Sequence, residues 1–371
     1  MSQRKKVKDS SSDHSLATRF WRSAKSCRAR DLRHLSILSE LVQAIRELVH
    51  ALQKERGASS IYLGSNGAQF GDRLVACMAD AGRVEARVRD RLAHVDEIME
   101  PASRGARFYT RVAVALAALD GLPNTRQQVS TLTLAPQDAL KIFTHVIALL
   151  LAVGFDAADV AADSDTSRVL IALVNFAQGK EYAGQERAAA GAALSRGHLD
   201  PKDRRHLRQL EVAQERAFKT FMEFADPRQI GAYVKLTNSP QTAELNRLRE
   251  IMLGVDAQSA ATRAVTPATW YRMATRRIDA MKDIEDCIAA DLARICDAKL
   301  AEADAAAQCA DVIDGNAPTL AAPLAMLITH VDAEADTTGK TEVPEIYGVG
   351  HGLPTPMRSI LDVVEDRKSV V

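Results

Sequence analysis

The sequence predicts an all-α protein, and three observations support this. Apolar residues recur at alternating spacings of three and four over long stretches, as in packed helices. Breaks between these stretches carry a capping side chain followed by proline. The 371 residues are 47% hydrophobic but only 5% aromatic, which is typical of long helices packed through small residues. No segment shows period-two alternation over the length of a strand, and the length suffices for a sizeable core.

The chain begins with a basic, serine-rich segment, residues 1–31, that we expect to be disordered. Residues 1–33 hold ten Lys or Arg against three Asp. No apolar run of a secretory signal follows the basic start. The basic charge could serve nucleic acid, but only Phe20 and Trp21 could stack on bases there.

Helical periodicity then occupies about residues 32–306. One apolar seam runs from Leu35 to Leu63 and ends in a turn at 64–71. A second runs from Leu170 to Leu194 and ends at 195–197. A third runs from Trp270 to Ile295. About eight or more helices are expected in this region.

Helix starts are indicated by four dipeptides that place a capping side chain before a first-turn proline: Asp200-Pro201, Asp226-Pro227, Ser239-Pro240 and Thr266-Pro267. Ala135-Pro136 is a weaker case. The longest apolar stretch, Val146–Phe155, is too short to cross a bilayer and is predicted to be a buried core helix.

Each seam carries one arginine where a leucine is expected: Arg56, Arg187 and Arg277. An unpaired buried charge costs several kcal/mol, so a carboxylate of the protein or a bound anion must meet each guanidinium. Three planar guanidinium groups that converge on one pocket would suit a small planar oxyanion. Asp279 or another carboxylate is the alternative partner, whereas Glu55 and Glu186 adjoin their arginines and should point elsewhere.

An internal echo strengthens two of these positions. Glu55-Arg56 and Glu186-Arg187 are each followed by mostly small residues and by a leucine seven positions after the arginine. Small residues let a neighbouring helix approach and leave room beside the guanidinium. Chance similarity in an alanine-rich chain is the alternative.

Four further polar residues could contribute to the same site. Lys180 lies on the second seam and either adds charge or extends its amine to water. Thr144 and Tyr182 could donate hydroxyl hydrogen bonds to an oxyanion. Arg276 points about 100° away from Arg277 on a helix, so it should lie behind the site or face solvent.

Three segments resemble motifs of the NIT family, the nitrate- and nitrite-sensing domain. They are residues 52–65 (LQKERGASSIYLGS), 179–188 (GKEYAGQERA) and 270–279 (WYRMATRRID), and they occur in the family's order over about residues 40–300. The resemblance implies two packed four-helix bundles that bind nitrate or nitrite between helices through arginines. Arg56, Arg187 and Arg277 are the matching positions.

Residues 307–371 are expected to form an acidic, linker-like tail with short helices that acts as an output segment. Residues 311–371 hold ten acidic against four basic groups. Two short apolar pieces, 320–331 and 357–364, interrupt the tail. Soluble family members carry an RNA-binding module called ANTAR after the sensor, and we find no such pattern after Ala310.

Nothing indicates an enzyme, a cofactor or a metal. Gly339-Lys340-Thr341 ends like a phosphate-binding loop, but Glu334 replaces the required first glycine. The glycines at 348–352 lack a flanking strand and helix. No nucleophile elbow or metal-ligand histidine pair is present, and the odd count of five cysteines, without a CxxC pair, fits reduced thiols in the cytoplasm.

We therefore expect a cytoplasmic, non-catalytic sensor of nitrate or nitrite that signals by bundle rearrangement. Its partner would be a regulatory protein, with a homodimer as a further option and no membrane or nucleic acid involved. The alternatives are a ligand-free helical scaffold or adaptor, and a nucleic-acid-binding regulator that uses the basic N-terminus.

Overall fold

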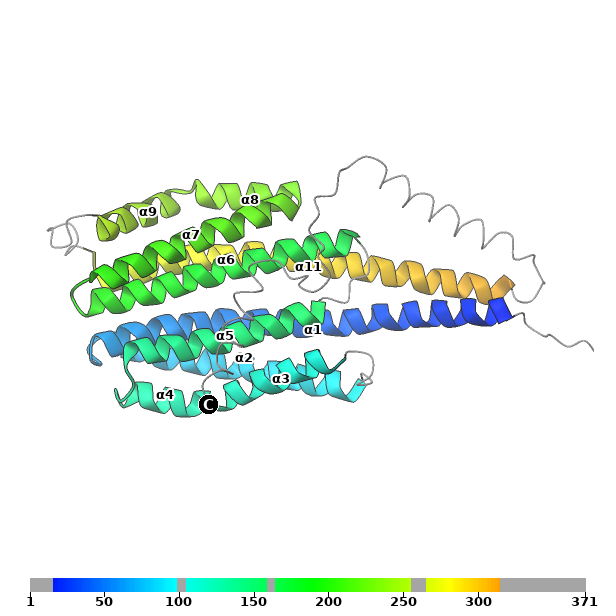
Figure 1. The fold of residues 1–371 in the computed structure, drawn as a ribbon, viewed down its shortest axis with the longest axis horizontal. Coiled ribbons are helices and arrows are strands. Elements are labelled where there is room, and N and C mark those ends of the chain that lie inside the picture. The colour runs from blue at the N-terminus through cyan, green and yellow to red at the C-terminus, as the bar shows by residue number, and fades with distance from the viewer. Residues whose placement is uncertain (1–15, 99–104, 159–163, 255–264, 314–371) are drawn as a thin grey trace, which may run out of the picture. The chain divides into compact units, whose positions relative to one another are not determined.

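The computed structural model describes residues 16–98, 105–158, 164–254 and 265–313, and this part of the chain is helical without strands (Figure 1). Residues Arg30–Leu300 form one compact unit, and the two ends of the chain belong to another. The helices are α1 (Leu16–Gly64), α2 (Gly71–Ile98), α3 (Gly105–Asp120), α4 (Leu122–Ser130), α5 (Pro136–Ala158), α6 (Ser164–Ser195), α7 (Pro201–Phe224), α8 (Pro227–Thr237), α9 (Pro240–Leu253) and α11 (Pro267–Ile313).

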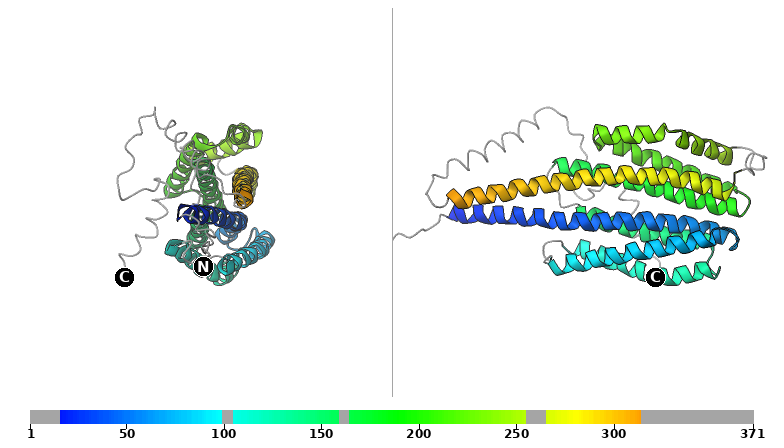
Figure 2. Two further views of the ribbon diagram at one scale, coloured as in Figure 1. Left: turned by 90° about the vertical axis from the view of Figure 1, so that its right-hand side faces the viewer. Right: turned by 180° about the vertical axis from the view of Figure 1, so that it is seen from behind.

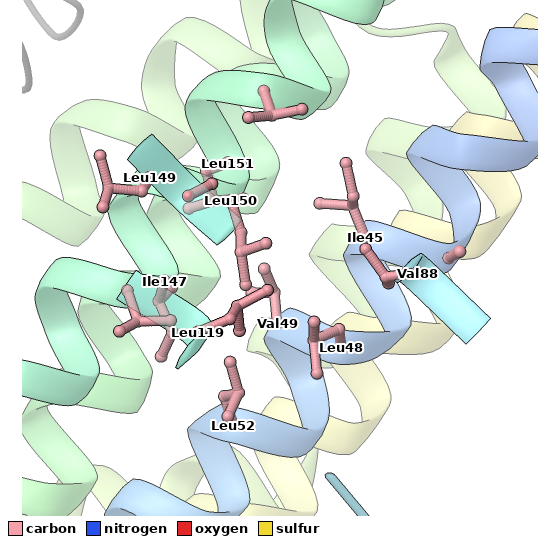
Figure 3. Packing of buried hydrophobic residues seen from close by; sticks show 14 of the residues in the cluster. Ile45, Leu48, Val49, Leu52, Val88, Leu119, Ile147, Leu149, Leu150 and Leu151 are labelled. Carbon is pink, nitrogen blue, oxygen red and sulfur yellow. The ribbon is translucent and has the colours of Figure 1, made fainter. Parts of the chain in front are cut away.

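The first half of the unit consists of α1, α2, α5 and a pair of shorter helices, α3 and α4. Its core is formed by aliphatic side chains that project from α1 and α5 toward each other, including Ile45, Leu48 and Leu150, with Val88 of α2 and Leu119 of α3 beside them (Figure 3). Because α3 and α4 follow one another along the bundle, this half has the plan of a four-helix bundle.

The second half repeats this plan with α6, α7, α11 and another pair of shorter helices, α8 and α9. Its core contains an aromatic cluster in which Phe176 of α6 meets Phe218 and Phe221 of α7 at 5.4 and 4.8 Å between ring centroids. Tyr233 of α8 stacks on Phe218 at 4.7 Å. Figures 1 and 2 show α7–α9 on one side of α6 and α11, and α2–α4 on the far side of α1. The expected two four-helix bundles are thus confirmed.

The capped helix starts are confirmed. The Asp200, Asp226 and Ser239 side chains each accept backbone N–H bonds from the first turns of α7, α8 and α9. The Thr266 hydroxyl accepts the N–H of Thr269 at the start of α11. The weaker signal before Pro136 also marks a helix start, that of α5.

Two boundaries differ from the sequence-based expectation. Helix α1 begins at Leu16, so residues 16–31, expected to be disordered, are helical. No glycine or proline interrupts 16–56, and the leucines, alanines and arginines in this stretch favour a helix. Helix α11 extends to Ile313, beyond the boundary expected at 306. The two apolar pieces of the tail, the loop-like sequence at 334–341 and the glycines at 348–352 lie outside the described residues.

Helix α5 is more apolar than expected, because residues Pro136–Asp156 are long and hydrophobic enough to cross a membrane by length and composition. The core helix of a soluble protein passes the same test, and half of this stretch is buried inside the protein. Phe143, Ile147 and Leu150 of α5 are almost fully buried against the rest of the first half.

Candidate functional site

The candidate site lies at the boundary between the two halves, where α1 of the first half crosses α6 of the second. The two helices run in the same direction, because Gln53 meets Glu181 and Ile61, further along α1, meets Gly191. They approach closely at glycines. A Cβ on Gly57 would lie 3.1 Å from Arg187 Nε, and a Cβ on Gly184 would lie 2.7 Å from a terminal nitrogen of Arg56. Each arginine therefore lies over a glycine of the opposite helix.

Arg56 on α1 is fully buried and is paired with a carboxylate of the second half. Its guanidinium donates to both oxygens of Glu181 on α6, at 2.5 and 3.1 Å, and to the hydroxyl of Thr144 on α5 at 3.0 Å. Glu181 also accepts hydrogen bonds from the amides of Gln53 and Gln185, at 2.8 and 2.9 Å. The alternative of an internal salt bridge thus applies to this arginine, through a carboxylate that the sequence had not singled out.

Arg187 on α6 is equally buried, but no carboxylate of the described residues lies within salt-bridge distance. Its guanidinium donates to the hydroxyl of Thr275 on α11 at 2.9 Å and to the backbone carbonyl of Gln53. It lies 5.0 Å from the centre of the Tyr271 ring, within cation–π range. Burial lowers the pKa of Arg187; Tyr271 partly offsets this, and the positive charge of Arg56 lowers the pKa further. All the groups that hydrogen-bond or stack with Arg187 are neutral, and the nearest effect of a carboxylate comes from Asp279, beyond salt-bridge distance.

The echo in the sequence corresponds to repeated contacts. Arg56 reaches Thr144, 88 residues further on, and Arg187 reaches Thr275, also 88 residues further on. The glutamates that precede these arginines behave alike. Glu55 forms two hydrogen bonds with Arg126 of α4, and Glu186 forms two with Arg249 of α9. As expected, both carboxylates point away from the adjoining arginine.

Arg277 on α11 is buried as expected, but its contacts belong to another part of the second half. It donates to the side-chain oxygen of Gln214 at 2.8 Å, and Gln214 in turn donates to Glu186 at 2.9 Å. Thr275 and Arg277 are two positions apart, about 200° around the helix. Burial and the nearby charge of Arg249 lower the pKa of Arg277 to about 10, with Glu186 acting in the opposite direction.

Arg277 also lines a cavity of about 510 Å³ in the second half. The walls come from α7, α8, α9 and α11, and they carry both signs of charge, including Arg208, Glu211 and Glu250. The structure therefore brings Arg56 and Arg187 together at the crossing of α1 and α6, and it gives Arg277 a separate set of neighbours.

Lys180 neither adds a free charge to the site nor extends to water. Its side chain is fully buried and its amine is hydrogen-bonded to Glu285 of α11 at 2.5 Å. Arg46 of α1 lies 3.8 Å from the same carboxylate and also pairs with Asp286. Burial lowers the pKa of Lys180 despite the attraction of Glu285. This network is a second polar contact between α1 and the other half.

The remaining expected residues divide as follows. Thr144 is part of the site through its bond to Arg56. Arg276 is exposed, as its position beside Arg277 indicated. Tyr182 is half-buried on α6, adjacent in the chain to Glu181 but about 100° away around the helix.

Sequence reasoning missed Glu181, Gln53 and Thr275. Thr275 could have been found, because it follows Arg187 at the interval that separates Thr144 from Arg56. Glu181 could not, since nothing in one sequence shows which α6 residue meets Arg56 across the crossing. Among the described residues, no group of three or more His, Cys, Asp or Glu side chains is placed to hold a metal ion.

The arrangement gathers hydrogen-bond donors of the kind that bind small anions. Two guanidinium groups and two hydroxyls, from Thr144 and Thr275, supply hydrogen-bond donors in a buried place, where charge-assisted hydrogen bonds are strong. The Nε–H groups of both Arg56 and Arg187 are buried without a hydrogen-bond partner. Unused donors of this kind require an explanation, such as a ligand or a bound water.

Comparisons with known proteins agree with this picture. The family described as "Nitrate and nitrite sensing" matches residues 47–293. The chain is 30% identical over 279 residues to the "Nitrate regulatory protein" of Klebsiella oxytoca, which covers 75% of this chain and 68% of that protein. The fold of the present chain is similar to that of the NasR transcription antiterminator. The TM-score is 0.66 and the identity 26%, over 76% of this chain and 75% of the NasR chain. The matched region contains all three seam arginines, and the chain belongs to the nitrate and nitrite sensing family.

Proposed function

We propose that this protein is a cytoplasmic sensor that binds nitrate or nitrite between its helices through two of the three arginines expected from the sequence, Arg56 and Arg187. Arg56 and Arg187 would contact the anion at the crossing of α1 and α6, together with the hydroxyls of Thr144 and Thr275. Arg277, the third arginine expected from the sequence, lies against Gln214 of α7, away from this crossing. The family membership supports the choice of ligand.

One observation carries the proposal: the buried guanidinium of Arg187 has no carboxylate partner among the described residues. Removing such a charge from water costs several kcal/mol. Nitrate and nitrite are planar, carry one negative charge and accept two parallel hydrogen bonds from a guanidinium. Either anion would compensate Arg187 with little added volume, which suits a crossing that is already close-packed around Gly57 and Gly184.

The signal would arise from a shift between two arrangements of the helices. Without an anion, Glu181 neutralises Arg56, whereas Arg187 has no carboxylate partner and the charge of Arg56 acts against it. With the anion in place, α1 of the first half and α6 and α11 of the second half are drawn together. The free energy available for signalling is limited to the preference of the anion for this closed arrangement.

The first experiment measures the melting temperature in nitrate, nitrite and chloride at equal ionic strength. A ligand at about a hundred times its dissociation constant adds roughly 2.7 kcal/mol, which is about 5–10 °C for a unit of this size. Nitrate or nitrite should produce this shift and chloride much less. Equal melting temperatures in all three salts, with folded protein, would contradict the proposal.

A shortened chain that ends at Ile313 is the matched control. All three arginines lie upstream, so this chain should keep the nitrate shift, and in cells it should lose the response if residues 314–371 carry the output. Loss of the shift itself would show that the tail belongs to the anion-binding fold.

The output is proposed to pass to a regulatory protein or a second copy of this chain. A role in transcription is the second candidate, because the fold is similar to that of a transcription antiterminator. RNA binding that changes on adding nitrate, and that is lost when residues 1–30 are deleted, would favour this candidate.

A further inference from the structure

Glu181 is paired with Arg56, one of the two arginines of the proposed anion site. Its side chain is almost completely buried and both of its oxygens accept bonds from Arg56. The crossing of α1 and α6 therefore holds two buried cations and one carboxylate that bonds to only one of them. No carboxylate of the described residues bonds to Arg187, and an anion between Arg56 and Arg187 would supply that missing partner.

The geometry also provides for the release of Glu181 from Arg56. One of its oxygens accepts the side-chain amide of Gln53 at 2.8 Å, and the other accepts that of Gln185 at 2.9 Å. If Arg56 turned toward a bound anion, both oxygens would keep a donor. A carboxylate without such donors would be left unsatisfied in a buried place, which is strongly unfavourable.

We propose that Glu181 is an internal counter-anion that competes with nitrate for Arg56. In the ligand-free protein it neutralises Arg56 and holds α1 against α6; when the anion enters, Arg56 exchanges Glu181 for the ligand. This inference rests on the proposed function. The competition would also set the apparent affinity for nitrate. Only molecules in which Arg56 has left Glu181 can bind the anion, so the apparent affinity is reduced in proportion to the fraction of such molecules.

The competition has a consequence for selectivity. An anion must match the two parallel bonds that the carboxylate already makes with Arg56, so planar oxyanions can replace Glu181 and a spherical halide replaces it poorly. The internal carboxylate would therefore help the site to reject chloride. It would also link ligand binding directly to a contact between the two halves.

The test is calorimetric titration of the full chain with nitrate, using the wild type and Glu181→Gln. Glutamine keeps the shape of the side chain but removes the competing charge. We expect Glu181→Gln to melt at a lower temperature than the wild type without nitrate, to bind nitrate at least tenfold more tightly, and to gain more in melting temperature from it. Nitrate binding that is unchanged or weaker in this variant would overturn the inference.

Glu285→Gln is the matched control, because Glu285 is an equally buried carboxylate that pairs with Lys180, the neighbour of Glu181 in the chain. It should lower the melting temperature without tightening nitrate binding. If both variants tighten binding alike, general loosening explains the effect and the inference fails.

Glu181→Asp covers the case in which the glutamine variant does not fold. Aspartate keeps the charge but is one methylene shorter, so it should pair less well with Arg56 and bind nitrate with intermediate affinity. Wild-type affinity in Glu181→Asp would contradict the competition. If the wild type itself binds no nitrate, the proposed function fails, whereas a binding wild type with unresponsive Glu181 variants removes only the role of Glu181.

Discussion

The three seam arginines differ in how their charge is compensated. Arg56 has a carboxylate, Arg187 has a hydroxyl, a carbonyl and a ring face, and Arg277 has the amide oxygen of Gln214. Removing one partner of a buried ion pair costs about 3–5 kcal/mol. Substitution of Arg56 should therefore destabilise the ligand-free protein, whereas substitution of Arg187 relieves a repulsion and should destabilise it less.

Periodicity predicted the burial of these residues because a helix places every third or fourth side chain on one face. It could not predict their partners. Glu181 reaches Arg56 across a helix crossing whose register depends on Gly57 and Gly184. Glu285 of α11 likewise pairs with the buried Lys180 of α6 through a contact between two helices. Arg277 lies on a buried face as predicted, but that face meets α7 at Gln214.

His50 provides a pH-dependent test of the polar boundary between the halves. Its Nε2 atom lies 3.3 Å from a carboxylate oxygen of Asp279, and burial lowers its pKa to about 4 although Asp279 acts to raise it. The unfolded chain binds this proton below about pH 6.5, and the folded protein does so only near pH 4. The folded state, in which His50 is neutral, is therefore fully stable above about pH 6.5, and its free energy of unfolding decreases as the pH falls from 6.5 toward 4.

We expect the free energy of unfolding to fall by about 1–2 kcal/mol between pH 6.5 and 5 because of this residue, since one pKa unit corresponds to about 1.36 kcal/mol. Urea unfolding of the wild type and of His50→Gln across this range measures the effect. The variant should show a flatter dependence on pH. Parallel curves would mean that His50 is protonated in the folded protein.

At the scale of the helices, the close approach of α1 and α6 determines how the two halves meet at the site. A methyl group on Gly57 would lie 2.8 Å from a ring carbon of Tyr271, and that ring is buried with its hydroxyl bonded to the carbonyl of Lys54 at 3.2 Å. The ring cannot move aside without losing this bond and its contact with Arg187. Close approach, rather than backbone conformation, requires glycine here.

Gly57→Ala should therefore destabilise the protein, because overpacking costs about 1–3 kcal/mol and outweighs the higher helix propensity of alanine. Gly82→Ala in α2 is the control: nothing lies within 4 Å of its added methyl group, so a gain of about 0.5–1 kcal/mol is expected. Thermal unfolding measures both. The account of the crossing is contradicted if the two substitutions change stability in the same direction.

Helix starts were predictable where local chemistry decides them, as at Asp200, Asp226 and Ser239. The start of α1 at Leu16 was not predicted, because the basic, serine-rich composition of the segment suggested disorder, although the helix propensity of residues 16–31 favours a helix. The end of α11 was misplaced for a related reason: alanine-rich sequence continues the helix past the last apolar seam residue.

At the scale of the whole unit, the two halves repeat one plan, and the repeat is visible in the sequence only at Glu55-Arg56 and Glu186-Arg187. The interval of 88 residues to Thr144 and Thr275 extends it to the last helix of each half. The symmetry is broken by Glu181, which gives Arg56 a carboxylate and leaves Arg187 without one. An anion that compensates Arg187 would tie the two halves together.

The most direct test of this account is calorimetric titration of nitrate into the wild type, Arg187→Ala and Arg276→Ala. Arg276 is exposed and adjoins Arg277, so its variant controls for the general loss of positive charge. Saturable binding is expected to the wild type and to Arg276→Ala, and none to folded Arg187→Ala. Binding of nitrate to Arg187→Ala with wild-type affinity would contradict it.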